Sequence, residues 1–170
     1  MLIIAVRHDS QLREEHWLKC FFCCSRLNII SIPPSVTFID KLAFYNCLSL
    51  QSVIIPDSVT KIEDSVFECC TSLTFISIPD SVTSIGFKAY RWCLSLGTIS
   101  IPDSVTSIGK YAFSHCKSLL SVNIPRSLVS IGDGVFDDCI SLSIVNVPLL
   151  TYTRLKEKLQ GLISKIIFSD

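Results

Sequence analysis

Ile-Pro pairs recur along this chain every 23 residues without an insertion or a deletion. The pairs are Ile32-Pro33, Ile55-Pro56, Ile78-Pro79, Ile101-Pro102, Ile124-Pro125 and the variant Val147-Pro148. A fixed period of this length is typical of solenoids, in which each repeat forms one rung and packs only on its neighbours. The period therefore predicts the architecture, and it moves the question of function from catalysis toward surface recognition.

Five full repeats span residues 32–54, 55–77, 78–100, 101–123 and 124–146. The positions that are apolar in every copy are, in the repeat 101–123, Ile101, Val105, Ile108, Ala112, Phe113, Cys116, Leu119 and Val122. Burying these side chains yields no more free energy than ordering one repeat costs in backbone entropy. Stacking must supply the rest, so we expect the inward columns to form one continuous core and the two ends to need caps.

The end of each repeat has the pattern of a short strand. Leu119, Val122 and Ile124 are spaced as in a strand that lies beside its copies in a parallel sheet. Pro125 lacks a backbone donor and is expected to close the strand. The Pro-Asp-Ser sequence that follows in most repeats predicts a turn in which Asp or Ser bonds to the local backbone.

The middle of each repeat predicts two further elements on the opposite side. Val105 and Ile108, followed by Gly109, form a second short buried run. Ala112, Phe113 and Cys116 have helical spacing, so we expect a single helical or 3₁₀ turn there.

The first 31 residues are interpreted as a degenerate capping rung. Phe21, Cys24, Leu27 and Ile30 fall on the aromatic, cysteine, leucine and valine columns. Residues 2–6 are predicted to form a strand and residues 10–22 a longer helix.

Residues 149–170 are interpreted as a C-terminal capping helix that follows a closing strand at 147–148. Thr153 is a candidate N-cap. One face of this helix would hold Leu155, Leu159, Leu162 or Ile163, and Ile166. We expect a packing lid, with an amphipathic membrane or partner helix as the alternative.

The repeat IPxSVTxIGxxAFxxCxSLxxVx resembles the 23-residue unit of the BspA-like leucine-rich repeat family over about residues 20–148. The resemblance implies an α/β leucine-rich-repeat solenoid with a parallel sheet on its concave face and short turns on its convex side. It also implies a binding or adhesion role, since members often lie on cell surfaces within longer proteins. The chain departs from the family in its short array and in lacking an export signal, and a Pro turn replaces the Asn ladder of commoner leucine-rich repeats.

Bulk composition excludes some functions. The 15 basic and 15 acidic residues give a net charge of zero, which argues against binding nucleic acid. No apolar run reaches the roughly 18 residues of a membrane span. The start of the chain lacks the basic region of a signal peptide. We therefore expect a cytoplasmic location for the chain as written, and a cell-surface location if its N-terminus is truncated.

Six of the nine cysteines form one column at the 23-residue period: Cys24, Cys47, Cys70, Cys93, Cys116 and Cys139. Neighbouring rungs lie about 4.8 Å apart, within the reach of a disulfide. The neighbours of the column are apolar, however, and parallel side chains have poor disulfide geometry. We expect free thiols that pack as small hydrophobes.

Two groups of residues have the spacing of metal ligands. His16, Cys20 and Cys23 would share one stripe of a helix, with His8 as a possible fourth ligand for zinc. Asp57, Asp80 and Asp103 form a column after the prolines that could hold Ca²⁺. Without a second CxxC or a calcium-binding nonapeptide, we expect packing for the first group and turns for the second. No metal or cofactor is predicted.

Catalytic motifs are weak. His115 and Cys116 are adjacent, but Cys116 belongs to a core column and His115 is expected outside the core, so the two are badly placed as a dyad. The chain has no nucleophile elbow or phosphate-binding glycine loop. We expect a protein that is not an enzyme.

Outward positions of the predicted strands are the candidate binding site. None of these residues is charged: Gln51, Ser52, Ile54, Thr74, Phe75, Ser77, Thr98, Ser100, Leu120, Ser121, Asn123, Ser143, Ile144 and Asn146. A neutral surface of hydroxyl and amide groups with a few apolar side chains suits a protein or glycan partner.

Two functions remain open. The first is a non-catalytic, monomeric interaction module that binds a partner protein through the concave sheet. The second is a structural or adhesive segment of a cell-surface type protein, which self-associates end to end or binds a glycan or host surface.

Overall fold

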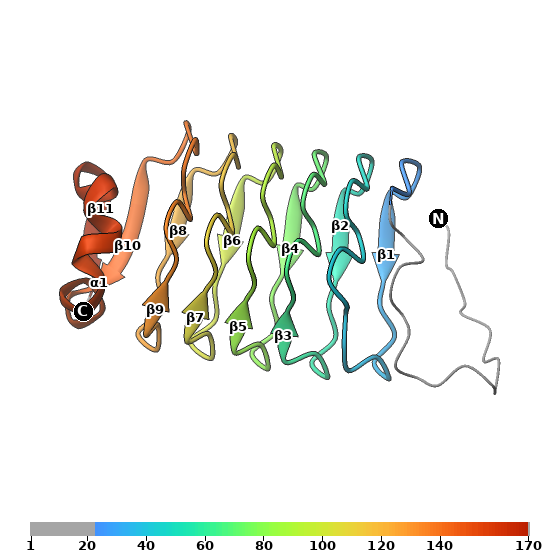
Figure 1. The fold of residues 1–170 in the computed structure, drawn as a ribbon, viewed down its shortest axis with the longest axis horizontal. Coiled ribbons are helices and arrows are strands. Elements are labelled where there is room, and N and C mark those ends of the chain that lie inside the picture. The colour runs from blue at the N-terminus through green and yellow to red at the C-terminus, as the bar shows by residue number, and fades with distance from the viewer. Residues whose placement is uncertain (1–22, 170) are drawn as a thin grey trace.

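The computed structural model describes residues 23–169, which form a stack of similar rungs along the long axis of the molecule (Figure 1). The predicted strand at 2–6 and the predicted helix at 10–22 lie outside the described residues. From residue 55 to residue 146, each rung has one strand in each of two layers of parallel strands. Within the described residues, one α-helix lies at the C-terminal end.

The first layer contains the strands predicted at the ends of the repeats, and we call it the front sheet. Its strands are β1 (Ile29–Ser31), β2 (Ser52–Ile54), β4 (Phe75–Ser77), β6 (Thr98–Ser100), β8 (Ser121–Asn123), β10 (Ile144–Pro148) and β11 (Ile166–Ser169). Every pairing is parallel, and from β1 to β4 and again from β6 to β10 each residue faces its equivalent 23 positions away, as Val53 faces Ile76. The parallel sheet predicted from the repeat is confirmed.

The second layer, here called the back sheet, contains the short buried runs predicted on the opposite side. Its strands are β3 (Lys61–Ile62), β5 (Ser84–Ile85), β7 (Ser107–Ile108) and β9 (Ser130–Ile131), paired in parallel in that order. Ile62, Ile85 and Ile108 are almost completely buried. These side chains face the core, and the preceding residues face outward.

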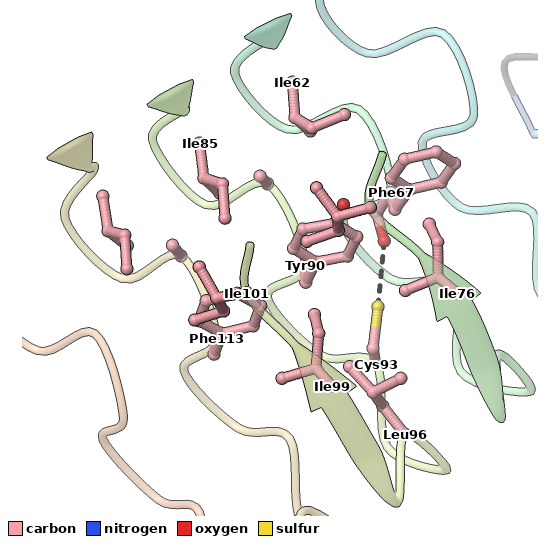
Figure 2. Packing of buried hydrophobic residues seen from close by; sticks show 14 of the residues in the cluster. Ile62, Phe67, Ile76, Ile85, Tyr90, Cys93, Leu96, Ile99, Ile101 and Phe113 are labelled. Atoms are coloured by element: carbon pink, nitrogen blue, oxygen red, sulfur yellow. Dashed lines mark hydrogen bonds between the residues drawn. The ribbon is translucent and has the colours of Figure 1, made fainter. Parts of the chain in front are cut away.

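The core lies between the two sheets and is built from the columns that the repeat predicts. All eight columns of the repeats are buried. The aromatic rings stack nearly parallel, as between Phe67 and Tyr90 (centroids 5.4 Å apart) and between Tyr90 and Phe113 (5.2 Å) (Figure 2). Offset stacking of this kind adds to the free energy gained from burial, so a regular column fixes the spacing of the rungs.

Each Ile-Pro pair ends a front strand and begins a turn. The N–H group of Ile124 donates to the carbonyl of Asn146 at 2.8 Å, and Pro125 has no N–H group with which to continue the ladder. The carbonyl of Pro125 then accepts from Leu128 at 3.2 Å. The predicted closure of the strand is thus observed.

The serine of this turn bonds to the neighbouring rung rather than to its own turn, so the predicted local role was wrong. Ser81 Oγ donates to the carbonyl of Val59 at 2.6 Å, and Ser104 Oγ donates to Val82 at 2.6 Å. The turn places the hydroxyl against the preceding rung, where it satisfies a carbonyl group.

The predicted helical turn is replaced by a run of β-turns, because alternate N–H groups bond to the next rung. The N–H groups of Tyr111, Phe113 and His115 donate to carbonyls of the following rung over 2.7–3.0 Å. The N–H groups of Ala112, Ser114 and Cys116 donate to carbonyls three residues earlier in the same rung, over 3.2–3.3 Å. Tyr111 and His115 take left-handed φ values of 58° and 62°, which a helix does not allow.

The C-terminal cap differs from the single helix that was predicted. Helix α1 (Leu149–Leu159) begins after Pro148, and the 3₁₀-helix η1 (Gln160–Lys165) leads into β11, which pairs with β10. Thr153 lies inside α1, where its hydroxyl donates to Leu149 O at 2.9 Å, so it is not the N-cap. Leu155 and Leu159 are buried as predicted, whereas Ile163 is exposed. Helix, 3₁₀-helix and strand together form a shortened last rung.

The front sheet is interrupted between β4 and β6, although the back sheet continues across the same two rungs. The N–H groups of Thr74 and Leu120 donate to Gln51 and Gly97 in the preceding rungs at 3.0 Å each. The Thr74 hydroxyl adds a second bond to Gln51 O at 3.2 Å. Gly97 has no hydroxyl group that could clamp the preceding rung with a second hydrogen bond, as Thr74 does, and it lies at the interruption.

Gly97→Thr should therefore stabilise the array. No atom lies within 4 Å of the position that its Cβ would take. The substitution removes backbone freedom from the unfolded chain and offers a hydroxyl clamp, so we expect a gain of about 1 kcal/mol in the free energy of unfolding. Urea unfolding followed by circular dichroism measures the gain.

Gly109→Thr is the matched control, since its Cβ would lie 2.6 Å from the backbone of Gly86. This variant should lose stability. An equal response of the two variants would contradict the assignment of Gly97 to a weak point of the sheet.

The hydroxyl group of Tyr90 is buried in the aromatic column without a hydrogen-bond partner. The equivalent side chains in the neighbouring rungs, Phe67 and Phe113, have no hydroxyl to satisfy. A buried unsatisfied hydroxyl costs about 1–3 kcal/mol.

Tyr90→Phe should accordingly raise the urea midpoint of unfolding, because the ring stack is kept and the orphaned hydroxyl is removed. The reciprocal variant Phe67→Tyr places a hydroxyl in the same column and should lower the midpoint. A Tyr90→Phe variant less stable than the parent chain would show that the hydroxyl has a partner in solution.

Candidate functional site

All fourteen candidate residues lie in or beside the front sheet, and none of them is buried. The register aligns them in columns across the rungs. Two outward columns cross the strands. The first holds Ser52 beside Phe75, and Thr98 beside Ser121 and Ile144. The second holds Ile54 beside Ser77, and Ser100 beside Asn123 and Asn146. The structure therefore brings the predicted residues together on one face, which we call the front face.

Apolar side chains stand out from this face. The exposed fractions of the predicted members are 61% for Ile54, 57% for Phe75, 54% for Leu120 and 38% for Ile144. Ile29 is exposed in the same column as Phe75, two rungs away. Exposed apolar groups on a sheet are the anchors that protein partners commonly bury.

One apolar residue of the face was missed because the last rung was predicted to be helical. Ile167 lies on β11 opposite Asn146 and is exposed. The run of residues 166–168, Ile-Ile-Phe, is rich in residues that favour strands, and this signal could have identified β11.

Several polar groups of the front face already bond to the array. Asn146 Nδ2 donates to Asn123 Oδ1 at 2.7 Å, and the Ser143 hydroxyl donates to Leu120 O at 3.2 Å. These contacts fix the orientation of the side chains. A partner would therefore meet a pre-organised surface, which lowers the entropic cost of binding.

A second cluster of aromatic and ionisable side chains, not predicted from the sequence, lies at the turns. Trp92 and His115 stack at 4.0 Å with an angle of 7° between their planes, and His115 Nδ1 lies 3.0 Å from Asp138 Oδ2. That nitrogen is close enough for an ion pair, but its orientation is not that of a hydrogen bond. Lys117 Nζ lies 6.0 Å from the Trp92 ring. The cluster joins successive rungs through rings and charges.

His115 and Cys116 contact different parts of the molecule. The Cys116 thiol is buried and donates to Tyr90 O at 3.2 Å, while His115 stacks on Trp92 at the surface. The two side chains are thus not arranged as a nucleophile and its base.

From Cys47 to Cys139 the cysteine column lies in the core, and Cys24 is partly buried against it. Its thiols donate to the carbonyl of an aromatic residue in the preceding rung, as Cys93 Sγ donates to Phe67 O at 3.2 Å (Figure 2). Cys70, Cys93, Cys116 and Cys139 are free thiols, each in such a bond of 3.1–3.2 Å. Burial raises the pKa of Cys139 from 9.0 to about 11 and the pKa of Cys93 well above its usual value. Thiols held protonated in this way are poor nucleophiles and poor metal ligands.

The candidate metal ligands are not gathered into a site in the part of the chain that the structure describes. His8, His16 and Cys20 lie outside that part. Cys23 is exposed, and its sulfur accepts from Asn46 Nδ2 at 3.6 Å. Among residues 23–169, no group of three His, Cys, Asp or Glu side chains is arranged to hold a metal ion. None of the helices within these residues is long and apolar enough to cross a bilayer.

The fold and its exposed sheet define a solenoid repeat protein. Residues 18–90 and 83–159 match the BspA type leucine rich repeat region, with six copies of the repeat. The chain belongs to the BspA-type leucine-rich repeat family. The resemblance seen in the repeat sequence is therefore confirmed.

Solved structures of bacterial leucine-rich repeat proteins are similar over most of the chain. A leucine-rich repeat protein from Bacteroides ovatus ATCC 8483 is 35% identical, with a TM-score of 0.76 over 90% of this chain and 39% of that one. The T. pallidum leucine rich repeat protein is 32% identical, with a TM-score of 0.67 over 89% of this chain and 78% of that one.

A leucine rich cell surface protein from Faecalibacterium prausnitzii A2-165 is 33% identical, with a TM-score of 0.58 over 76% of this chain and 42% of that one. The chain thus spans less than half the length of the Bacteroides and Faecalibacterium proteins. No curated protein matches it in sequence.

The buried thiols make the stability of the array sensitive to alkaline pH. Burial raises the pKa of Cys47 and of Cys139 from 9.0 to about 11. The folded chain therefore holds these thiol protons more tightly than the unfolded chain does. Because of this difference, the free energy of unfolding is highest below pH 9 and falls as the pH rises toward 11. We expect the free energy of unfolding to fall in this window by up to about 1.4 kcal/mol per pH unit for each thiol.

Urea unfolding at a series of pH values tests this expectation. Replacing Cys47 with Ala should lower stability at neutral pH and reduce the alkaline slope. A free energy of unfolding that does not change over this window would contradict the raised pKa values.

Proposed function

We propose that this chain is a non-catalytic interaction module that binds a partner protein through the front face. The observation that carries the proposal is an outward sheet surface without a charged residue from β1 to β10, on which Ile54, Phe75 and Leu120 are each more than half exposed. Large apolar groups cost free energy when they face water, so their presence on a rigid sheet favours a partner that covers them.

The surrounding polar groups support a protein partner. Serine, threonine and asparagine side chains border the apolar residues, and they can donate and accept hydrogen bonds. An apolar centre with a polar, uncharged border is typical of protein interfaces. Because such a face has no net charge, we expect binding that depends weakly on salt.

We infer a second function, adhesion as part of a cell-surface type protein, from a different observation. A 33% identical relative carries the name of a leucine rich cell surface protein. Apolar side chains are also exposed at the C-terminal end of the array, where Leu150 is 80% exposed and Phe168 is 53% exposed. End-to-end contact between copies through that end would support an adhesive or structural role.

The double variant Phe75→Ser, Leu120→Ser should bind a partner protein at least tenfold more weakly, since two apolar anchors together contribute more than ~1.4 kcal/mol. Both side chains are exposed, so the stability of the fold should not change. Proteins captured by the parent chain and lost by the double variant would be identified by mass spectrometry, and their affinities measured by calorimetry.

Phe38→Ser, Val129→Ser is the matched control, because both residues are exposed outside the front face. Equal binding by the two double variants would contradict the proposal. A molecular mass that rises with concentration, and returns to the monomer value in Leu150→Ser, Phe168→Ser, would instead favour the second function.

A further inference from the structure

The alternating hydrogen bonds of the turns end at the last full repeat. In earlier rungs, the N–H groups of Tyr111, Phe113 and His115 donate to the next rung at 3.0, 3.0 and 2.7 Å. The equivalent N–H groups, 23 residues later, belong to Gly134, Phe136 and Asp138. Within the described residues these three donate no hydrogen bond to backbone or side chain.

The three residues that carry these N–H groups line a pocket. It has a volume of about 340 Å³ and lies between the turn at residues 132–140 and the shortened last rung. Leu159, Gly161 and Leu162 form part of its opposite wall. The pocket exists because α1 and η1 replace the β-turns of a full rung, so the acceptor carbonyls that every earlier rung provides are missing here.

Charges around the pocket balance. Asp137, Asp138, Lys158 and Lys165 all line it. Asp138 lies beside His115, and Lys158 pairs with Asp133. Two carboxylates and two ammonium groups leave no excess of positive charge for a free anion, so a neutral acceptor fits the site better.

We propose that this pocket binds a segment of polypeptide, whose alternate carbonyl oxygens accept hydrogen bonds from the N–H groups of Gly134, Phe136 and Asp138. The upstream rungs show which acceptor groups bond to a row of donors of this kind. In the upstream rungs, the groups that bond to this row of donors are carbonyls of alternate residues, as Phe113 N bonds to Val135 O at 3.0 Å. Binding by addition to an open row of backbone donors is a known mode of peptide recognition. The site lies at the turns and does not involve the front face.

Amide hydrogen exchange of the whole chain, followed by NMR, tests the proposal with acetyl-trialanine amide as the probe. In the free chain, the amides of Tyr111, Phe113 and His115 should exchange slowly and those of Gly134, Phe136 and Asp138 quickly. Saturating peptide should slow the second set by about tenfold or more and leave the first set unchanged. No slowing at millimolar peptide would overturn the proposal.

Two further experiments identify the kind of molecule that binds to the three N–H groups. Sodium acetate at the same concentration should have no effect, and equal slowing by acetate would assign the row to an anion and overturn the peptide site. Protection of the three amides that rises with protein concentration, without peptide, would assign the row to a second copy and also overturn it.

Gly161→Phe should abolish the effect of the peptide, because Gly161 lines the pocket and no atom lies within 4 Å of its Cβ position, so the pocket wall has room for a bulky ring that would hinder binding. Gly97→Phe is the matched control, with equally open space on the front face. The control should retain the response of the three amides. Amide spectra that are unchanged away from the substituted residue show that each variant is folded, and a peptide response that survives Gly161→Phe contradicts the site.

Discussion

The structure depends on the completion of each rung's backbone hydrogen bonds by the rung that follows. At the turns, N–H groups such as that of Phe113 reach across to Val135 O, and the thiol of Cys93 returns a bond to Phe67 O. The left-handed residues that aim these groups, Tyr111 and His115 among them, cost about 1–2 kcal/mol each. Only a stack of near-identical neighbours offsets that cost, so the 23-residue period has to be kept at every step.

The same constraint separates positions that hold the fold from positions that can carry function. Columns such as Phe67, Tyr90 and Phe113 are closed on every side by their copies. On the front sheet the intervening side chains face outward, and there Phe75 stands beside Ser52 while Ile144 stands beside Ser121. A rigid array with freely varying outward residues is suited to recognition by surface shape, which is the function proposed for the front face.

The repeat alone was enough to predict both sheets, the core columns and the residues of the front face, because each column of the period has one burial state. Features that depend on the geometry between rungs could not be predicted. Ala112, Phe113 and Cys116 have helical spacing, yet hydrogen bonding to the next rung prevents a helix. The serine hydroxyls, the stack of Trp92 on His115 and the open N–H groups of Gly134, Phe136 and Asp138 also need three-dimensional placement. At the C-terminus, the amphipathic pattern was correct for α1, but nothing in it indicated that the chain returns to the sheet as β11.

The interruption of the front sheet at Gly97 has a mechanical consequence. Between β4 and β6, the two adjoining rungs are joined by the back sheet and the turns, without a ladder on the front. A tensile load along the long axis would concentrate at this seam, which would open on the front side while the pairing of β3 with β5 in the back sheet acted as the hinge. The array would then respond to force as two stiff blocks joined by a flexure, and the curvature of its front face would change without loss of either block.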